Sequence, residues 1–117
     1  MPNPVVYFEV IGKDHKALSS FYSALFDWDV QPAGPGNYNF ANPGDGISGG
    51  IGAFPGGEKS YQTFFVQVDD LHATLDKVKE LGGSTLIEPM NVAEDTDVAV
   101  FQDPEDHVIG IVARSTS

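Results

Sequence analysis

The chain contains no cysteine and few basic residues. The absence of thiols excludes disulfides, thiolate catalysis and zinc–sulfur sites, and it fits a reducing cytoplasm. The 117 residues carry six Lys plus Arg against 17 Asp plus Glu, a net charge of −11. A surface this negative repels phosphate backbones and anionic lipids, so neither nucleic acid nor a membrane is an expected partner.

Long apolar runs are also missing, and no charged-then-apolar leader precedes the first apolar segment. We therefore expect no membrane span and no signal peptide, and a cytoplasmic location. The length suits one domain, residues 1–117, with a modest core. Between Leu81 and Ala113 there is no Lys or Arg. The acidic residues there lack the spacing of a calcium loop, which favours a solvated acidic face over a cation-binding loop.

What the chain does contain is a degenerate internal repeat. The stretch Val5–Val30 reads as strand, turn, helix and strand, and Tyr61–Leu86 repeats that order 56 residues later. The shift aligns Asp14 with Asp70, and each is a suitable N-cap for the helix that follows. Further strands follow each helix, so the sequence predicts an α+β fold of two tandem βαβββ units, approximately 4–54 and 60–113. One such unit cannot bury its sheet alone, so we expect two curved sheets to form a cup with the helices outside.

The individual elements follow from apolar periodicity and turn signals. In the first unit we expect strands near 5–11, 28–31, 38–41 and 47–54, and in the second near 63–68, 85–89, 98–102 and 108–112. The residues 55–59 are the expected hinge between the units. An apolar stripe on the first helix, which we expect to be buried, consists of Leu18, Phe21, Tyr22 and Leu25.

Three glycines interrupt one predicted strand, at Gly49, Gly50 and Gly52. Glycine in a strand interior is costly unless a bulge forms there or another group approaches the backbone closely. The sequence leaves open a bulge on one side and close approach of a ligand or partner subunit on the other.

The first strand places a carboxylate on its inward face. Alternation puts Tyr7 and Glu9 on that face, while Val6, Phe8 and Val10 pack on the helices. An unpaired buried carboxylate is costly, so Glu9 has either a partner or a raised pKa that suits acid–base chemistry. A structural hydrogen-bond network is the alternative role. The candidate cationic partners are Lys13, Lys16 and, across a dimer, Arg114.

Several segments in order resemble the vicinal oxygen chelate superfamily, which includes glyoxalase I, bleomycin-resistance proteins, fosfomycin-resistance enzymes and extradiol dioxygenases. They are YFEVIGKD, FYSALFDW, FFVQVDDLHATLDKVKELGG and FQDPEDHVIGI, which span most of the chain. The chain is most similar to small glyoxalase-like proteins with FYSxLFGW and DPEGNxIG segments. It departs from them at Asp27, which replaces glycine, and at Asp106-His107, which replace Gly-Asn.

The resemblance also implies where a metal would be bound. Metal-dependent members use four cup-facing strand positions, usually His, Glu or Gln, and here these positions hold Tyr7, Gly52, Thr63 and Gly110. Two of these residues have no side-chain donor, so we expect the glyoxalase-type metal site to be missing and no cofactor, although a divalent metal stays open.

The three histidines offer little replacement for the missing ligands. His15 and His72 fall in helix first turns, on the outer layer, where we expect surface roles. His107 is the best exception, because it begins the strand that leads to Gly110.

The expected ligand site in the cup is formed by Tyr7, Glu9, Trp28, Tyr38, Thr63, Phe65, Gln67 and Val108. Its aromatic and amide groups suit a flat or amphipathic small molecule. The first hypothesis is a metal-free binding protein, like bleomycin-resistance members, and that resemblance implies a homodimer. The second is a lyase or isomerase acting on a small carbonyl compound, with Glu9 and Tyr7 as catalytic candidates. The third is a non-catalytic interaction module.

Overall fold

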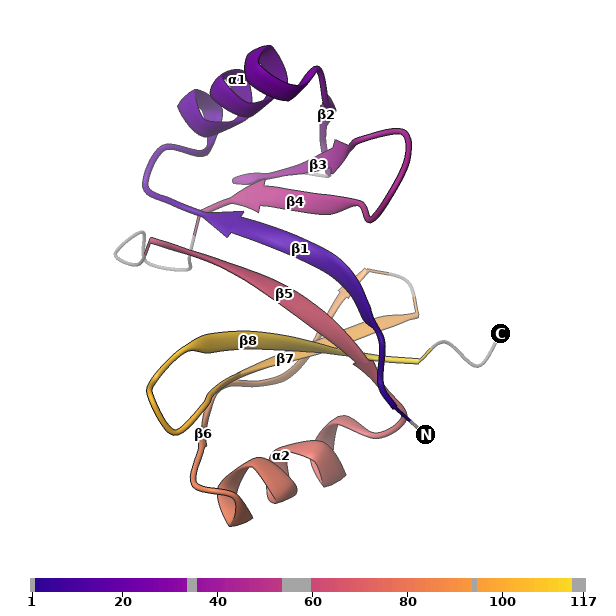
Figure 1. The fold of residues 1–117 in the computed structure, drawn as a ribbon, viewed down its shortest axis with the longest axis vertical. Helices are drawn as coiled ribbons and strands as arrows, with labels where there is room; N and C mark the ends of the chain where they lie inside the picture. Colours follow the sequence, from indigo (N-terminus) through magenta and orange to yellow (C-terminus); the bar gives the residue numbers. More distant parts are fainter. Residues whose placement is uncertain (1, 34–35, 54–59, 94, 115–117) are drawn as a thin grey trace. The chain divides into compact units, whose positions relative to one another are not determined.

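The computed structural model describes residues 2–33, 36–53, 60–93 and 95–114 (Figure 1). The first half contains β1 (Val5–Ile11), α1 (His15–Phe26), β2 (Asp29–Pro32), β3 (Tyr38–Asn42) and β4 (Gly49–Gly52). The second half contains β5 (Tyr61–Val68), α2 (Leu71–Glu80), β6 (Ser84–Ala93), β7 (Thr96–Gln102) and β8 (Val108–Ala113). The predicted α+β class and the two βαβββ units are confirmed. The strand expected over 47–54 is shorter, and the one expected over 85–89 extends to Ala93.

The chain divides into two compact units, Tyr7–Thr63 and a unit made of Met1–Val6 with Phe64–Ser117. The first residues of the chain therefore belong with the second repeat, where the N–H of Gln67 donates to the carbonyl of Pro4 at 2.9 Å. The hinge expected over 55–59 lies outside the described residues. No helix in the described ranges is long and apolar enough to cross a membrane.

In the unit Tyr7–Thr63 the strands lie in the order β2-β3-β4-β1. The β1–β4 pair is parallel, and the β2–β3 and β3–β4 pairs are antiparallel. Helix α1 lies on one face of this sheet, where the side chain of Asn39 donates to the hydroxyl of Ser19 at 2.8 Å. Since side chains alternate along a strand, Tyr38 and Phe40 point to the opposite face.

In the other unit the order is β5-β8-β7-β6, with β5 parallel to β8. Helix α2 covers one face of this sheet (Figure 1). The core between α2 and this sheet consists of Val68, Leu71, Leu75, Ala99 and Ile111. These five residues are each at most 6% exposed.

The repeat is preserved at the level of single hydrogen bonds. Asp14 caps α1 by accepting from the N–H of Ala17 at 3.0 Å, and Asp70 caps α2 by accepting from the N–H of Ala73 at 3.0 Å. Both pairs are related by the same 56-residue shift, so each repeat starts its helix in the same way.

Two positions where the sequence replaces the family's glycine keep a left-handed backbone. Asp27, the C-cap of α1, has φ of 60°, and Asp106 in the β7–β8 turn has φ of 67°. Glycine adopts this conformation without strain, and Asp tolerates it better than most residues. The local backbone is therefore retained although the residue has changed.

The apolar stripe of α1 is not buried as predicted. Phe21 and Leu25 are each 58% exposed, and the buried residue of the helix is Ser19. The other half of the stripe, Leu18 and Tyr22, is half-buried. The face of the helix that carries them and Ser19 packs on the sheet, and the neighbouring face, with Phe21 and Leu25, stays uncovered.

The glycines of β4 are explained by aromatic rings of the same unit. A Cβ atom at Gly49 would lie 2.5 Å from the ring of Phe8, and one at Gly50 would lie 1.7 Å from the hydroxyl oxygen of Tyr38. The register of β4 with both neighbours is continuous, so the bulge that the sequence left open is not present. The close approach that glycine permits is made by the protein's own side chains.

Candidate functional site

A chain of hydrogen bonds joins Tyr7, Tyr38 and Glu9 on the sheet face opposite α1. The hydroxyl of Tyr38 donates to Oε2 of Glu9 at 2.8 Å, and the hydroxyls of Tyr7 and Tyr38 are 2.8 Å apart. A phenol has one proton to donate. Because Tyr38 uses its proton on Glu9, Tyr7 is the donor in the second bond. The structure thus brings three of the predicted site residues into direct contact.

The strand register explains why these residues meet. Glu9 lies opposite Gly50 on β4, and Tyr38 on β3 lies opposite Gly52. A Cβ atom at Gly52 would lie 2.4 Å from the Tyr38 ring, so the ring lies across both glycines. Two residues without side chains on β4 therefore let a side chain from β3 reach one from β1.

Burial makes the ionised form of Glu9 unfavourable. Desolvation raises the pKa of Glu9, and the hydrogen bond from Tyr38 opposes that rise. Among the described residues, no lysine or arginine forms an ion pair with Glu9. Arg114, one of the expected partners, instead binds Asp69 at 2.8 Å. The structure shows a raised pKa for Glu9 and also a hydrogen-bond network around it, two of the possibilities that the sequence left open.

Three phenols surround this carboxylate. Burial, together with the charge of Glu9, raises the pKa of Tyr7 and of Tyr61 to about 12, although for Tyr7 the hydrogen bond with Tyr38 lowers it in part. Burial, followed by the charges of Glu9 and Tyr7, also raises the pKa of Tyr38. All three hydroxyls therefore keep their protons at neutral pH, and those of Tyr7 and Tyr38 donate the two hydrogen bonds described above.

Phe40 adds a third aromatic ring beside the hydrogen-bonded Tyr7, Tyr38 and Glu9. Its ring contacts Tyr7 edge to face, with ring centroids 6.3 Å apart, and its side chain is 53% exposed. The sequence analysis missed both Phe40 and Tyr61. Phe40 was detectable, because it lies two residues after Tyr38 and thus on the same strand face.

The remaining predicted site residues lie elsewhere in the two units. Trp28 is on the α1 side of its sheet, stacked with Tyr22 at 5.8 Å between ring centroids. Phe65, Gln67 and Val108 belong to the other unit, where Phe65 is buried against Gly110. Thr63 is partly exposed near the middle of β5.

The positions at which the resemblance to metal-dependent members places the metal ligands do not fit a divalent cation here. The occupants are Tyr7, Gly52, Thr63 and Gly110, and neither glycine has a side-chain donor. A Cβ atom at Gly110 would lie 2.4 Å from the ring of Phe65, so an aromatic side chain fills the space in which a ligand side chain would begin. The described residues contain no group of three or more His, Asp and Glu side chains arranged to bind a metal ion.

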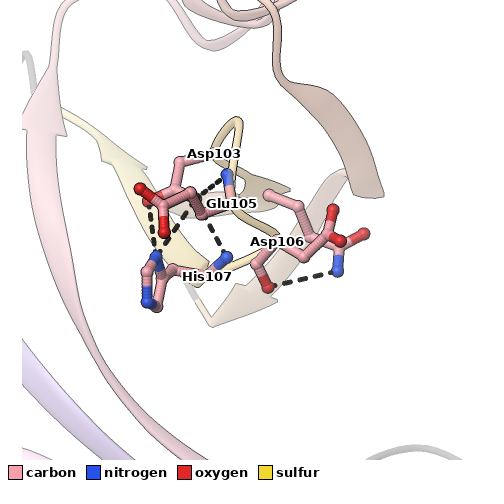
Figure 2. A network of polar contacts seen from close by, with 5 residues as sticks. Asp103, Glu105, Asp106 and His107 are labelled. Atoms are coloured by element: carbon pink, nitrogen blue, oxygen red, sulfur yellow. Dashed lines mark hydrogen bonds and ion pairs between the residues drawn. The ribbon is translucent and has the colours of Figure 1, made fainter.

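His107 is held in the β7–β8 turn (Figure 2). Its Nδ1 lies 3.0 Å from Oδ2 of Asp103, whose Oδ1 accepts the backbone N–H groups of His107 and Glu105. These contacts, chiefly the backbone bond from His107, hold the pKa of Asp103 below its usual range. His15 and His72 lie in the first turns of α1 and α2, as predicted. His107 thus forms part of the β7–β8 turn, and the other two histidines lie at the starts of the helices.

An open groove of about 640 Å³ lies beside α2 in the other unit. Its apolar floor includes Val68, Val78 and Phe101, and its rim carries acidic groups. Two of these carboxylates already have partners: Asp69 binds Arg114 and Asp70 caps α2. None of the residues predicted to bind a ligand lines this groove, so we place the candidate site at Glu9.

The family model for the glyoxalase-like domain matches residues 8–112. The chain belongs to this family. It is therefore a member of the vicinal oxygen chelate superfamily, with the fold that its two βαβββ units show. The match includes Glu9 and Tyr38 but begins one residue after Tyr7.

Over the residues that match, curated relatives are about a quarter identical to this glyoxalase-like domain. CFP32 of Mycobacterium tuberculosis, whose name assigns it provisionally to the glyoxylases, is 26% identical over 106 residues, covering 84% of this chain and 41% of CFP32. The anthracycline biosynthesis protein DnrV of Streptomyces peucetius is 27% identical, covering 88% of this chain and 44% of DnrV. The chain thus spans about two fifths of the length of these relatives. A glyoxylase-like domain-containing protein of Didymella fabae is 28% identical over 91% of this chain and 90% of its own.

Solved structures show the same fold at low identity. A glyoxalase/bleomycin resistance protein/dioxygenase superfamily member from Vibrio splendidus has a TM-score of 0.67 and 18% identity, covering 97% of this chain and all of that chain. The Mn(II)-bound glyoxalase of Novosphingobium aromaticivorans also has a TM-score of 0.67, with 14% identity over 95% of this chain and 38% of that chain. At this identity the likeness concerns the fold alone.

Proposed function

We propose that this glyoxalase-like protein binds a small organic cation with an aromatic part at Glu9, without the divalent metal of metal-dependent relatives. The observation that carries the proposal is a partly buried carboxylate that accepts a hydrogen bond from Tyr38 and has no cationic partner among the described residues. A ligand cation would supply that missing charge.

The chemistry of the site supports a cation over an anion. In the described part of the chain, the hydrogen bond to Glu9 goes to Oε2, which leaves Oε1 for a donor on the ligand. The phenol rings of Tyr7 and Tyr38 and the ring of Phe40 present π faces that attract cations and stack on flat groups. A net charge of −11 further favours the approach of cations.

A pair of anthracyclines tests the proposal by calorimetry at pH 7. DnrV acts in anthracycline biosynthesis by its name, so an anthracycline with its amino sugar is a reasonable probe, and the aglycone without the amine is its matched control. We expect the amine-bearing compound to bind more tightly, and Glu9→Gln to weaken that binding by about 10–100-fold, as loss of a charge-assisted hydrogen bond does. Glu88→Gln, at an exposed position on β6, is the matched variant and should bind like the native protein.

Two results would contradict the proposal. Equal binding of the two compounds by the native protein and by Glu9→Gln would show that the carboxylate does not recognise a cation. A stoichiometric divalent metal in the purified protein would refute the metal-free part, and elemental analysis measures it directly.

A lyase or isomerase acting on a small carbonyl compound is the second candidate. It is favoured by the raised pKa of Glu9 and by the proton of Tyr38 at 2.8 Å, an arrangement suited to moving a proton on and off a bound substrate. In that case Glu9 is the base, and Tyr7 polarises the carbonyl. The hemithioacetal of methylglyoxal and glutathione is the test substrate. Turnover that disappears in Glu9→Gln would support the enzyme, and binding without turnover would support the binding protein.

A further inference from the structure

Tyr7, Tyr38 and Glu9 form a line of hydrogen bonds, and we name these three residues the Glu9 triplet. The hydroxyl oxygens of Tyr7 and Tyr38 are 2.8 Å apart, and that of Tyr38 is 2.8 Å from Oε2 of Glu9. Both distances are those of O–H···O hydrogen bonds, whichever of the two oxygens carries the hydrogen. Because each phenol has one proton to donate, the direction of one bond fixes the direction of the next.

When Glu9 is ionised, the bonds of the Glu9 triplet run toward the carboxylate. A carboxylate only accepts, so Tyr38 donates to Oε2 and Tyr7 donates to Tyr38. The hydroxyl of Tyr7 has then used its proton inside the triplet, and toward a ligand its oxygen acts as an acceptor. This state suits a ligand that donates hydrogen bonds, as an ammonium group does.

A proton on Oε2 of Glu9 reverses both bonds. The carboxyl group then donates to the oxygen of Tyr38, the proton of Tyr38 turns to the oxygen of Tyr7, and the proton of Tyr7 turns away from Tyr38. The carboxyl group gains one proton and no phenol O–H bond breaks, because each hydroxyl hydrogen only rotates about its C–O bond. The rings stay in place, since the oxygen–oxygen distances suit either direction. In this state Tyr7 is a donor and suits a carbonyl oxygen.

The surroundings of Glu9 make its neutral form accessible. Burial raises the pKa of Glu9. The described titratable groups around it are phenols, Tyr7 on β1, Tyr38 on β3 and Tyr61 on β5, and the pKa of each lies far above that of a carboxyl group. Strand β4, which pairs with β1, contributes Gly50 opposite Glu9. Among these groups, Glu9 is therefore the one that changes charge first as the pH rises.

We infer that Tyr38 transmits the protonation state of Glu9 to Tyr7, and that Tyr7 thereby selects the ligand. With Glu9 ionised, Tyr7 accepts a hydrogen bond from an amine-bearing ligand. With Glu9 neutral, Tyr7 donates one to a carbonyl oxygen. Tyr38 is a positioning residue, since it acts through Tyr7. The two ligand classes rest on the proposed function, whereas the reversal of the hydrogen bonds is a property of the free protein.

Carbon-13 NMR of the free protein tests the reversal, because the chemical shift of a tyrosine Cζ depends on whether its hydroxyl donates or accepts. Between about pH 4 and pH 9 we expect the Cζ signal of Tyr7 to move with the same midpoint as the Cδ signal of Glu9. In Tyr38→Phe the carboxyl group stays and the connecting hydroxyl is lost, so the signal of Tyr7 should no longer follow Glu9. In Glu9→Gln it should be independent of pH.

Tyr61→Phe is the matched control for Tyr38→Phe. It removes a phenol whose pKa responds to the charge of Glu9 but which takes part in neither bond of the Glu9 triplet. Tyr7 and Glu9 should keep their shared midpoint in this variant. Circular dichroism of each variant establishes that it is folded.

Two matched probes test the selection of the ligand by calorimetry. The compounds 1-phenylethylamine and acetophenone share one carbon skeleton and differ in carrying an amine or a carbonyl group. We expect the amine to bind about 10-fold more tightly above the midpoint of Glu9 than below it, and acetophenone to show the opposite preference. Tyr7→Phe should abolish the pH dependence of acetophenone binding.

The outcomes separate this inference from the proposed function. A Tyr7 signal that stays constant while Glu9 titrates, or that still follows Glu9 in Tyr38→Phe, would overturn the transmission through Tyr38, even where the amine binds. Acetophenone binding that is independent of pH in the native protein would overturn the selection by Tyr7. If the amine failed to bind at every pH, the proposed function would be refuted, and a shared midpoint lost in Tyr38→Phe would still support the transmission.

Discussion

The substitution Gly50→Ala tests whether the β4 glycines leave the space that the ring of Tyr38 occupies. A Cβ atom at Gly50 would lie 1.7 Å from the hydroxyl oxygen of Tyr38 and 2.1 Å from Cζ. The ring must then move by roughly 1.5–2 Å to reach ordinary contact distance. A movement of this size breaks both 2.8 Å hydrogen bonds of the hydroxyl, to Glu9 and to Tyr7.

The expected cost follows from those two bonds. A neutral hydrogen bond contributes about 0.5–1.5 kcal/mol and one to a charged group about 1.5–3 kcal/mol. Replacing glycine by alanine within a strand recovers about 0.5–1 kcal/mol of backbone entropy. We therefore expect Gly50→Ala to lower the free energy of unfolding by about 1–4 kcal/mol, measured by urea denaturation at pH 7.

A double-mutant cycle separates the contact between residue 50 and the Tyr38 ring from other effects of the substitution. In a Tyr38→Ala background the obstructing ring is gone, so Gly50→Ala should then cost little or stabilise. Gly49→Ala is the matched control, because the atom it adds meets Phe8 on the other face. Its cost should be the same with and without Tyr38. If Gly50→Ala cost the same in both backgrounds, the reasoning about the Tyr38 ring would be refuted.

Three further predictions concern charge and backbone. Because the folded-state pKa of Glu9 is raised, its contribution to stability is present below its unfolded pKa and is lost as pH rises through the folded value. Glu9→Gln should remove that loss and so raise the melting temperature at pH 7 but not at pH 4. An equal change in melting temperature at both pH values would contradict this prediction. Asp106→Gly should stabilise by about 0.5–1 kcal/mol in urea titrations, since φ of 67° suits glycine, and a destabilised variant would show that the Asp106 side chain matters more than its backbone strain. Gly110→Glu, which places a usual metal-ligand type at this position, should bind no metal by elemental analysis. It should lower the free energy of unfolding by about 1–3 kcal/mol, because its side chain collides with the ring of Phe65; a gain of bound metal would refute this.

The sequence predicted the order of elements well because each boundary has a local cause. The helix starts follow from Asp14 and Asp70, and the stop of α2 follows from Gly82, whose φ is 99°. The repeat made each assignment in one half a check on the other. Alternation alone also predicted that Glu9 and Tyr7 share one face of β1, opposite that of Phe8.

What failed depended on contacts between distant parts of the sequence. Nothing in the sequence near Phe21 or Leu25 shows that the sheet leaves their face of α1 uncovered. Likewise, the hydrogen bond from Tyr38 to Glu9 joins residues 29 apart in the sequence. It forms because β4 has glycines, without side chains, where the ring of Tyr38 crosses it. The glycines were visible in the sequence, but the ring that lies on Gly50 and Gly52 was identified by the structure.

Asp27 places a negative charge at an electrostatically unfavourable point. It follows the last turn of α1, where the unpaired carbonyl groups carry the negative end of the helix dipole. A carboxylate there costs about 0.3–1 kcal/mol, and no basic residue in the last turn offsets it. Any cation that approaches this end, from another chain or from dissolved salt, relieves the cost. The end of α1 should therefore open more readily in dilute buffer than in salt, which amide hydrogen exchange at Phe26 and Asp27 would measure.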